Sequence, residues 1–133
     1  MKYMLDTNII AYAVNRRIPR VLEKIREHLP EGLCISAVTM AELEFGICNS
    51  SRPEQNRLAL MLFLSPIDVL PFDGLAAAHY GTIRADLKRR GEPIGANDLL
   101  IAAHARSLGL TLVSNNLKEF DKVEGLFTEN WVV

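Results

Sequence analysis

Near its start the chain reads Lys2-Tyr3-Met4-Leu5-Asp6-Thr7-Asn8, and this stretch decides the fold. A short apolar run stops at a carboxylate, and Thr7 or Asn8 can cap a helix that runs to about Val14. A buried strand followed by such residues is typical of the first βα unit of an open α/β sheet, whose ligand sites lie just beyond the carboxyl ends of the strands. We therefore take Asp6 as the first fixed point of a candidate active site, held at the rim of the sheet by Thr7 and Asn8.

Strands and helical segments alternate along the rest of the chain. This alternation predicts an α/β fold with a short parallel sheet of four to five strands and helices on both faces. No linker or repeat divides the sequence, so we expect a single domain over residues 1–133. Further strands are expected at 33–35, 67–70, 111–113 and within 126–132, and helices at 19–29, 37–48, 53–64, 74–90, 98–108 and 118–120.

The composition excludes several classes of protein. The net charge of −1 argues against a generally cationic nucleic-acid binder, although a local basic patch remains compatible with it. The longest apolar run, 58–64, is too short to span a bilayer, and Asp6 interrupts the first apolar run well short of a signal sequence. We therefore expect a cytoplasmic protein without a membrane partner. Cys34 and Cys48 lack metal-binding spacing and are expected to be buried thiols.

Three carboxylates occupy positions that would converge in such a sheet. Asp6 ends the first strand, Asp98 begins a helix after a glycine-containing linker, and Glu42 lies on the helix that follows the second strand. Each acid alone has an ordinary structural explanation, as a turn residue, a helix-capping residue or a half-solvated helix residue. Because strand ends of a parallel sheet meet at one rim, the three together indicate a site.

The orientation of Glu42 follows from the helix on which it lies. Val38, Ala41 and Phe45 share its side of the helix, and Glu44 points about 200° away. We therefore expect Glu42 to face inward and Glu44 to face solvent, with the apolar stripe continuing to Cys48.

Converging carboxylates repel one another, and a divalent hard cation relieves that repulsion. Mg²⁺ would leave open positions for a phosphate oxygen and an attacking water, so metal-assisted phosphodiester hydrolysis follows as a hypothesis. A fourth polar position is expected after the strand at 111–113. There Asn116 or Glu119 could complete the site, and Ser114 supplies a hydroxyl.

These residues lie in segments that resemble the PIN-domain ribonucleases, and specifically the VapC toxins of bacterial type II toxin–antitoxin pairs. The closing segments 123–126 and 129–131 resemble the enteric-type members. The resemblance covers the whole chain in matching order and spacing, and its main segments are Met4–Asn8, Ile35–Leu43, Gly95–Ala105 and Leu112–Phe120.

The resemblance implies a Mg²⁺- or Mn²⁺-dependent endoribonuclease that cuts structured RNA, such as the anticodon loop of a tRNA (initiator tRNA included), and stops translation. It implies that Asp6 and Asp98 are the principal metal ligands and that Glu42 binds directly or through water. Asn116 occupies or adjoins the position of the family's fourth acid, so either Glu119 substitutes for that acid or a second metal binds weakly. Ser114 stands where many relatives have threonine.

The resemblance also implies partners. A homodimer would be neutralised by a VapB antitoxin, whose C-terminal tail lies over a groove and places a basic side chain near the acids. Apolar residues on the helices at 37–48 and 53–64 could extend the dimer or antitoxin surface; they are Met40, Leu43, Phe45, Leu60, Met61 and Phe63.

Two basic clusters could hold RNA phosphates, and salt would then weaken RNA binding steeply. The second cluster also has a structural explanation, since cations stabilise the end of a helix. The clusters are Arg16, Arg17 and Arg20 after the first helix, and Arg84, Lys88, Arg89 and Arg90 at the end of the helix at 74–90.

Two alternatives from other classes remain at this point. A phosphatase of the haloacid dehalogenase type also has an Asp after its first strand, but it usually has a second Asp two residues later, where this chain has Asn8. A noncatalytic PIN-like RNA-binding domain would not need Asp6, Glu42 and Asp98.

Overall fold

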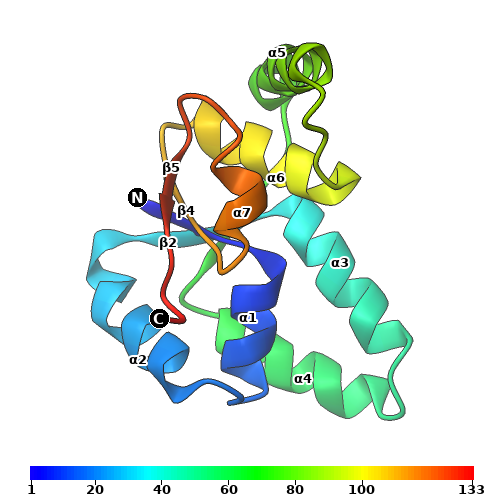
Figure 1. Ribbon diagram of the computed structural model, residues 1–133. Coiled ribbons are helices and arrows are strands. Elements are labelled where there is room, and N and C mark those ends of the chain that lie inside the picture. Colours follow the sequence, from blue (N-terminus) through cyan, green and yellow to red (C-terminus); the bar gives the residue numbers. More distant parts are fainter.

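The first strand, β1, lies at the centre of a five-stranded sheet in the computed structural model, which describes residues 1–133 (Figure 1). The strand order is β3-β2-β1-β4-β5, and every neighbouring pair is parallel. The predicted parallel sheet is therefore confirmed, and its five strands are the upper end of the expected four to five. The strands are β1 (Tyr3–Leu5), β2 (Leu33–Ser36), β3 (Asp68–Leu70), β4 (Thr111–Val113) and β5 (Phe127–Glu129).

Helices cover both faces of this sheet, as the unbroken burial of β1 requires. Tyr3 and Leu5 pack into one apolar cluster with α1, α2 and α4, whereas Met4 packs into a second cluster with α5, α6 and α7. No helix combines the length and the hydropathy that a membrane span requires. The helices are α1 (Thr7–Val14), α2 (Pro19–His28), the 3-10 turn η1 (Leu29–Glu31), α3 (Ala37–Cys48), α4 (Pro53–Leu64), α5 (Gly74–Arg90), α6 (Ala96–Ser107) and α7 (Leu117–Phe120).

The order in which strands are added to the sheet reverses at β1, and this reversal determines where a ligand can bind. The chain first adds β2 and β3 on one side of β1, and then crosses to add β4 and β5 on the other side. A crevice forms beyond the carboxyl ends of the strands where the order reverses. Here that point lies between β1 and β4, so the residues that follow Leu5 and Val113 border it.

Several local expectations were wrong. The residue that caps α1 is Asp6, in place of the expected Thr7 or Asn8. Its side chain accepts a hydrogen bond from the backbone N–H of Ile9. The helix of Asp98 begins two residues earlier than expected, at Ala96, which places Asp98 in its first turn and not at its cap.

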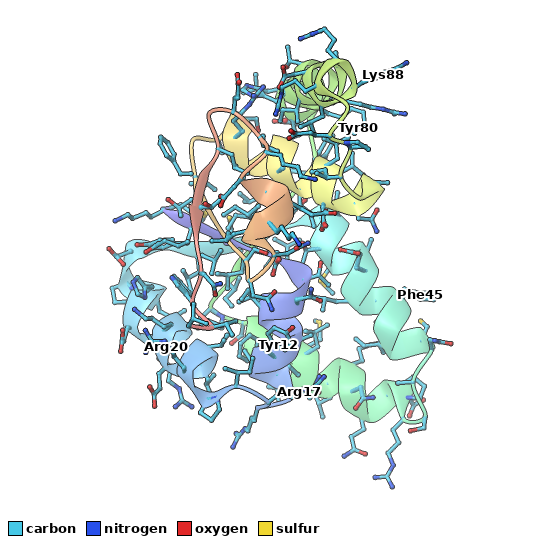
Figure 2. The ribbon with its side chains drawn as sticks, in the orientation of Figure 1. Tyr12, Arg17, Arg20, Phe45, Tyr80 and Lys88 are labelled. Carbon is cyan, nitrogen blue, oxygen red and sulfur yellow. The ribbon has the colours of Figure 1, made fainter.

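The stripe expected on α3 was also wrong, because that helix is apolar on more than one side. Phe45 is 70% exposed and Cys48 is exposed, whereas Thr39 and Ile47 are the buried residues of α3. Figure 2 shows Phe45 pointing outward from α3. Of the two cysteines only Cys34 is buried, so the expectation of two buried thiols holds for one of them.

Candidate active site

Asp6 occupies the crevice directly after β1. Asp6 is only 4% exposed, and one carboxyl oxygen accepts the Ile9 N–H at 2.9 Å. Burial raises the pKa of Asp6, and the charge of Glu42 raises it further, while hydrogen bonds from Ser114 and from the Ile9 backbone oppose the shift. The strand end thus holds a carboxyl whose charge is costly unless a positive group approaches it.

Glu42 reaches the same crevice from α3, as predicted, although the residues expected to accompany it lie elsewhere. The Thr7 hydroxyl donates to one of its oxygens, and the Asn97 amide donates to the other at 2.9 Å. These two donors fix the carboxylate between α1 and α6. The Thr39 hydroxyl, buried on α3, lies 3.4 Å from the Thr7 hydroxyl; because the Thr7 proton is directed at Glu42, Thr39 is the donor in this longer contact.

Asp98 and Glu119 form the third corner of the site. The pKa of Asp98 is raised to about 6 by burial, then by the hydrogen bond and charge of Glu119, and then by the charges of Asp6 and Glu42. All four carboxyls therefore interact around one crevice. Asn116 completes this corner with an amide nitrogen 3.5 Å from Asp98 Oδ2.

The linker before α6 approaches these acids closely at Gly95. Its backbone N–H donates to Glu119 Oε2 at 3.3 Å, and a Cβ placed there would lie 3.7 Å from Asp98 Oδ2. Gly95 therefore lies directly against both Asp98 and Glu119. Both Glu119 and Asn116, the two candidates for the fourth position, lie at Asp98.

Ser114 and Asn8 contribute differently from one another. Ser114 is fully buried after β4, its hydroxyl accepts the Asn116 N–H at 2.8 Å, and it lowers the pKa of Asp6. Asn8 is exposed, and its backbone N–H lowers the pKa of Asp6 only slightly, as the last and smallest of the causes. Sequence reasoning overlooked Asn97, although an amide directly before Asp98 was a visible signal.

The hydrogen-bond donors that hold these four acids are all neutral. None of Asp6, Glu42, Asp98 and Glu119 takes part in an ion pair. No set of three His, Cys, Asp or Glu side chains is arranged so that together it could hold a metal ion. The site is therefore an open rim of carboxylates and amides, and these oxygen ligands suit a hard cation that keeps its own waters.

The basic residues do not surround this rim evenly. Arg16, Arg17 and Arg20 are exposed around the start of α2, and Figure 2 places Arg17 and Arg20 toward the end of the molecule opposite Tyr80 and Lys88. At the end of α5, Arg89 and Arg90 pair with Asp86, and Arg90 also pairs with Glu92. Arg84 and Lys88 form no ion pair.

A groove of about 520 Å³ runs from the site along α1, α3 and α4. Thr7 and Glu42 form its end at the active site, and Gly46 and Ala59 line it farther away. The apolar residues expected to extend an interface fall into two groups, exposed and packed against the core. Phe45 and Met61 are exposed, whereas Leu60 is buried in the core and Met40, Leu43 and Phe63 pack against the core.

Comparison with known proteins identifies the family. The model of the PIN domain matches residues 3–126. Ribonuclease VapC2 of Haemophilus influenzae is 48% identical over 132 residues, which are 99% of each chain. The chain belongs to the VapC family of PIN-domain ribonucleases. This membership confirms the resemblance read from the sequence and disfavours a haloacid dehalogenase-type phosphatase.

Other VapC relatives are similar in sequence and in structure. A protein of Shigella flexneri named tRNA(fMet)-specific endonuclease VapC is 47% identical and aligned over 98% of each chain. The structure of VapBC2 from Rickettsia felis, bound to a DNA fragment from its promoter, has a TM-score of 0.93 at 39% identity. That alignment covers 98% of this chain and 99% of the other. The PIN-like fold is thereby confirmed over nearly the whole length.

Proposed function

We propose that this chain is the toxin of a VapBC pair, a metal-dependent endoribonuclease that hydrolyses phosphodiester bonds in tRNA and so inhibits translation. One observation carries the proposal: four carboxyls meet at the switch point of the sheet, held by neutral donors and by no cation. Such a cluster is costly unless a cation binds it. Family membership supplies the reaction class.

The residues present fit Mg²⁺ or Mn²⁺. Asp6 and Asp98 would be the principal ligands, with Glu42 and Glu119 beside them and Asn116 as a neutral oxygen donor. Mg²⁺ typically binds one or two carboxylates and keeps several waters, so an open rim meets its needs without a cage of three ligands. The cation would supply the positive charge that activates water and stabilises the leaving oxygen.

Neighbouring residues of the chain orient these carboxyl groups and set the pH at which they are charged. Thr7 and Asn97 hold Glu42 in one orientation, and the Ile9 N–H holds Asp6. Because the pKa of Asp98 is about 6, this carboxyl gains its full charge only above that pH. That value applies to the metal-free site, where a proton competes with the cation for Asp98, so we expect the Mg²⁺ concentration needed for half-maximal cleavage to fall as the pH rises through about 6.

The substrate proposal is a tRNA, with the anticodon loop of initiator tRNA as the target. It is supported by the relatives of Shigella flexneri and Salmonella typhimurium, both named tRNA(fMet)-specific endonuclease VapC, at 47% and 40% identity. Cleavage of initiator tRNA but not of an elongator tRNA with the same anticodon would agree with it. Equal cleavage of both would limit the assignment to tRNA in general.

The partner proposal is a VapB antitoxin bound to a homodimer of this chain. Solved relatives include VapBC complexes at 39–40% identity. The groove along α1, α3 and α4 ends at Thr7 and Glu42, so a tail lying in it could bring a basic side chain to the acids. Exposed apolar side chains nearby would be covered by the partners; they are Phe45, Leu58, Met61 and Leu62.

The decisive experiment measures cleavage of total tRNA with Mg²⁺, Mn²⁺ or EDTA. We expect Asp98→Asn and Asp6→Ala to lose cleavage by at least a hundredfold, and EDTA to abolish it. Glu54→Gln is the matched control. Glu54, like Asp98, lies in the first turn of a helix and forms no ion pair, but it is not one of the four acids of the site. Cleavage that survives EDTA or both substitutions would overturn the mechanism. Tight RNA binding without any cleavage would favour the noncatalytic alternative.

A further inference from the structure

A second cavity, of about 500 Å³, lies between the second half of α5, the linker 92–95 and the start of α6. Leu87 and Leu99, both buried, form its apolar base. Tyr80 and Ile94, half-buried, line it higher up. This cavity is separate from the groove along α1, α3 and α4, with which it shares no lining residue.

The cavity is the immediate neighbour of the candidate active site. Ile94 and Ala96 line the cavity, and Gly95 between them contacts the acids. The Gly95 N–H donates to Glu119, and its missing Cβ would point at Asp98. A wall one residue thick therefore separates the cavity from the catalytic carboxyls, so a strand whose phosphate reaches Asp98 can place its next nucleotide there.

The charges around the cavity suit a phosphate. Of the four basic residues near the end of α5, only Arg84 and Lys88 line the cavity, and these two are the pair without carboxylate partners. Arg89 and Arg90 lie outside it and pair with Asp86, at 3.8 and 2.8 Å. Both side chains are exposed and form no ion pair within the chain, so their charges are available to an anion, and an RNA backbone supplies one.

The aromatic side chain suits a base. The Arg84 guanidinium lies 5.8 Å from the centre of the Tyr80 ring and donates to the Tyr80 hydroxyl at 2.8 Å. The tyrosine ring and the guanidinium plane are both surfaces on which unpaired RNA bases stack. Figure 2 shows Tyr80 and Lys88 on the same helix, at the end of the molecule where α5 crosses above α6.

We propose that this cavity is a nucleotide subsite of the RNA substrate, next to the scissile phosphate. The base packs against Tyr80 and Ile94, and the adjoining phosphate binds Arg84 and Lys88. The inference rests on the proposed ribonuclease function and extends it by naming where the flanking nucleotide binds. An acidic protein segment would satisfy the two cations, but it would make no use of the stacking surface or of the adjoining site.

The first test measures binding of a fluorescein-labelled RNA hairpin to the full-length chain by anisotropy, in EDTA so that nothing is cleaved. For the double variant Arg84→Gln with Lys88→Gln, the loss of two single-strand phosphate contacts predicts affinity lower by about 25-fold at 0.1 M salt. The salt slope should fall by about 1.4. The charge-matched control is Arg26→Gln with Arg52→Gln, two exposed positions outside the cavity and outside both basic clusters, which should stay within about twofold.

A second pair of variants tests stacking separately from charge. Tyr80→Leu should weaken binding about 5- to 150-fold, the range for one stacked base. Tyr80→Phe keeps the ring and loses only the hydroxyl, so its affinity should stay close to that of the unchanged chain. Equal losses in both variants would contradict the stacking assignment. Thermal melting and light scattering of each variant establish that fold and oligomeric state are unchanged.

The outcomes separate this inference from the proposed function. If the chain cleaves and binds RNA, and the Arg84→Gln with Lys88→Gln variant does so equally well, the subsite is wrong and the ribonuclease stands. If that variant binds RNA normally but loses the antitoxin, the cavity belongs to a protein partner and the subsite is again wrong. If the unchanged chain neither binds nor cleaves RNA, the proposed function itself falls. Asp98→Asn should abolish cleavage and retain binding in EDTA.

Discussion

Replacing Asp98 by asparagine should stabilise the folded chain at pH 7.5 when no divalent cation is present. The pKa of this carboxyl is about 6 in the folded state, against 3.8 for the free group, because of burial and then of the acids around it. Between pH 3.8 and about 6 the folded chain holds a proton that the unfolded chain has lost. Stability contributed by this group therefore falls as the pH rises through that window and stays low above it.

The size of the effect follows from opposing contributions. The difference between 3.8 and about 6 corresponds to about 3 kcal/mol at most. Solvent screening of a partly exposed carboxyl reduces this to about 1–2 kcal/mol. The dipole of α6 opposes it, because an acid in the first turn of a helix is favoured by about 0.3–1 kcal/mol. The net gain for Asp98→Asn is about 1 kcal/mol, or about 3–5 °C in Tm for a chain of this length.

The assay is thermal melting followed by circular dichroism, in EDTA, at pH 7.5 and at pH 4. Glu54→Gln is the control of opposite sign, because Glu54 occupies the first turn of α4, where the helix dipole favours an acid. Asp98→Asn should raise the Tm at pH 7.5 and change it little at pH 4, whereas Glu54→Gln should lower it slightly at pH 7.5. An equal fall in Tm for both variants at pH 7.5 would refute the repulsion on which the metal-site argument rests.

Three other changes test separate parts of the structure. Mn²⁺ should raise the Tm of the unchanged chain at pH 7.5 and leave that of Asp98→Asn almost unchanged; equal shifts would point to cation binding elsewhere. Gly46→Phe, at a position where an added Cβ meets nothing within 4 Å, should fill the groove along α1, α3 and α4 and abolish co-purification with a co-expressed antitoxin; Gly81→Phe, at an equally open position of α5, should not. Ser36→Ala should lower the free energy of unfolding by about 2–4 kcal/mol in urea titrations, since it removes the cap of α3 and the partner of buried His104; a loss below 0.5 kcal/mol would contradict both roles.

Local chemistry explains why much of the fold could be predicted from the sequence. A run that is buried on both faces, a carboxylate at its end and a helix behind it are all encoded within a few residues of Asp6. The long helix α5 is bounded by Asp73, which accepts the Ala76 N–H, and by Gly91 in the left-handed conformation, as expected from the sequence. Such boundaries depend on neighbours in sequence and need no knowledge of the tertiary structure.

The orientation of α3 could not be predicted in the same way. Apolar side chains lie on several sides of that helix, and one side is exposed on the isolated chain. The helical wheel placed Glu42 correctly but gave Phe45 and Cys48 the wrong environment. The orientation of α3 depends on the hydrogen bonds of Glu42 with Thr7 and Asn97, which lie 35 and 55 residues away in the chain. Contacts over such distances leave no periodic trace in the sequence.

Asp6 and Asp98 differ in how cleanly they can test the function. Asp6 caps α1 with one oxygen while it faces the other acids, so Asp6→Ala removes a helix cap worth about 0.5–2 kcal/mol together with a candidate ligand. A loss of activity in that variant can follow from a disturbed α1, which also carries Thr7, the donor to Glu42. Asp98 caps nothing, and its removal relieves repulsion. If Asp98→Asn is more stable than the unchanged chain and yet does not cleave RNA, the loss of activity follows from the missing carboxylate and not from a disturbed fold. Asp98→Asn is therefore the variant that tests the functional assignment.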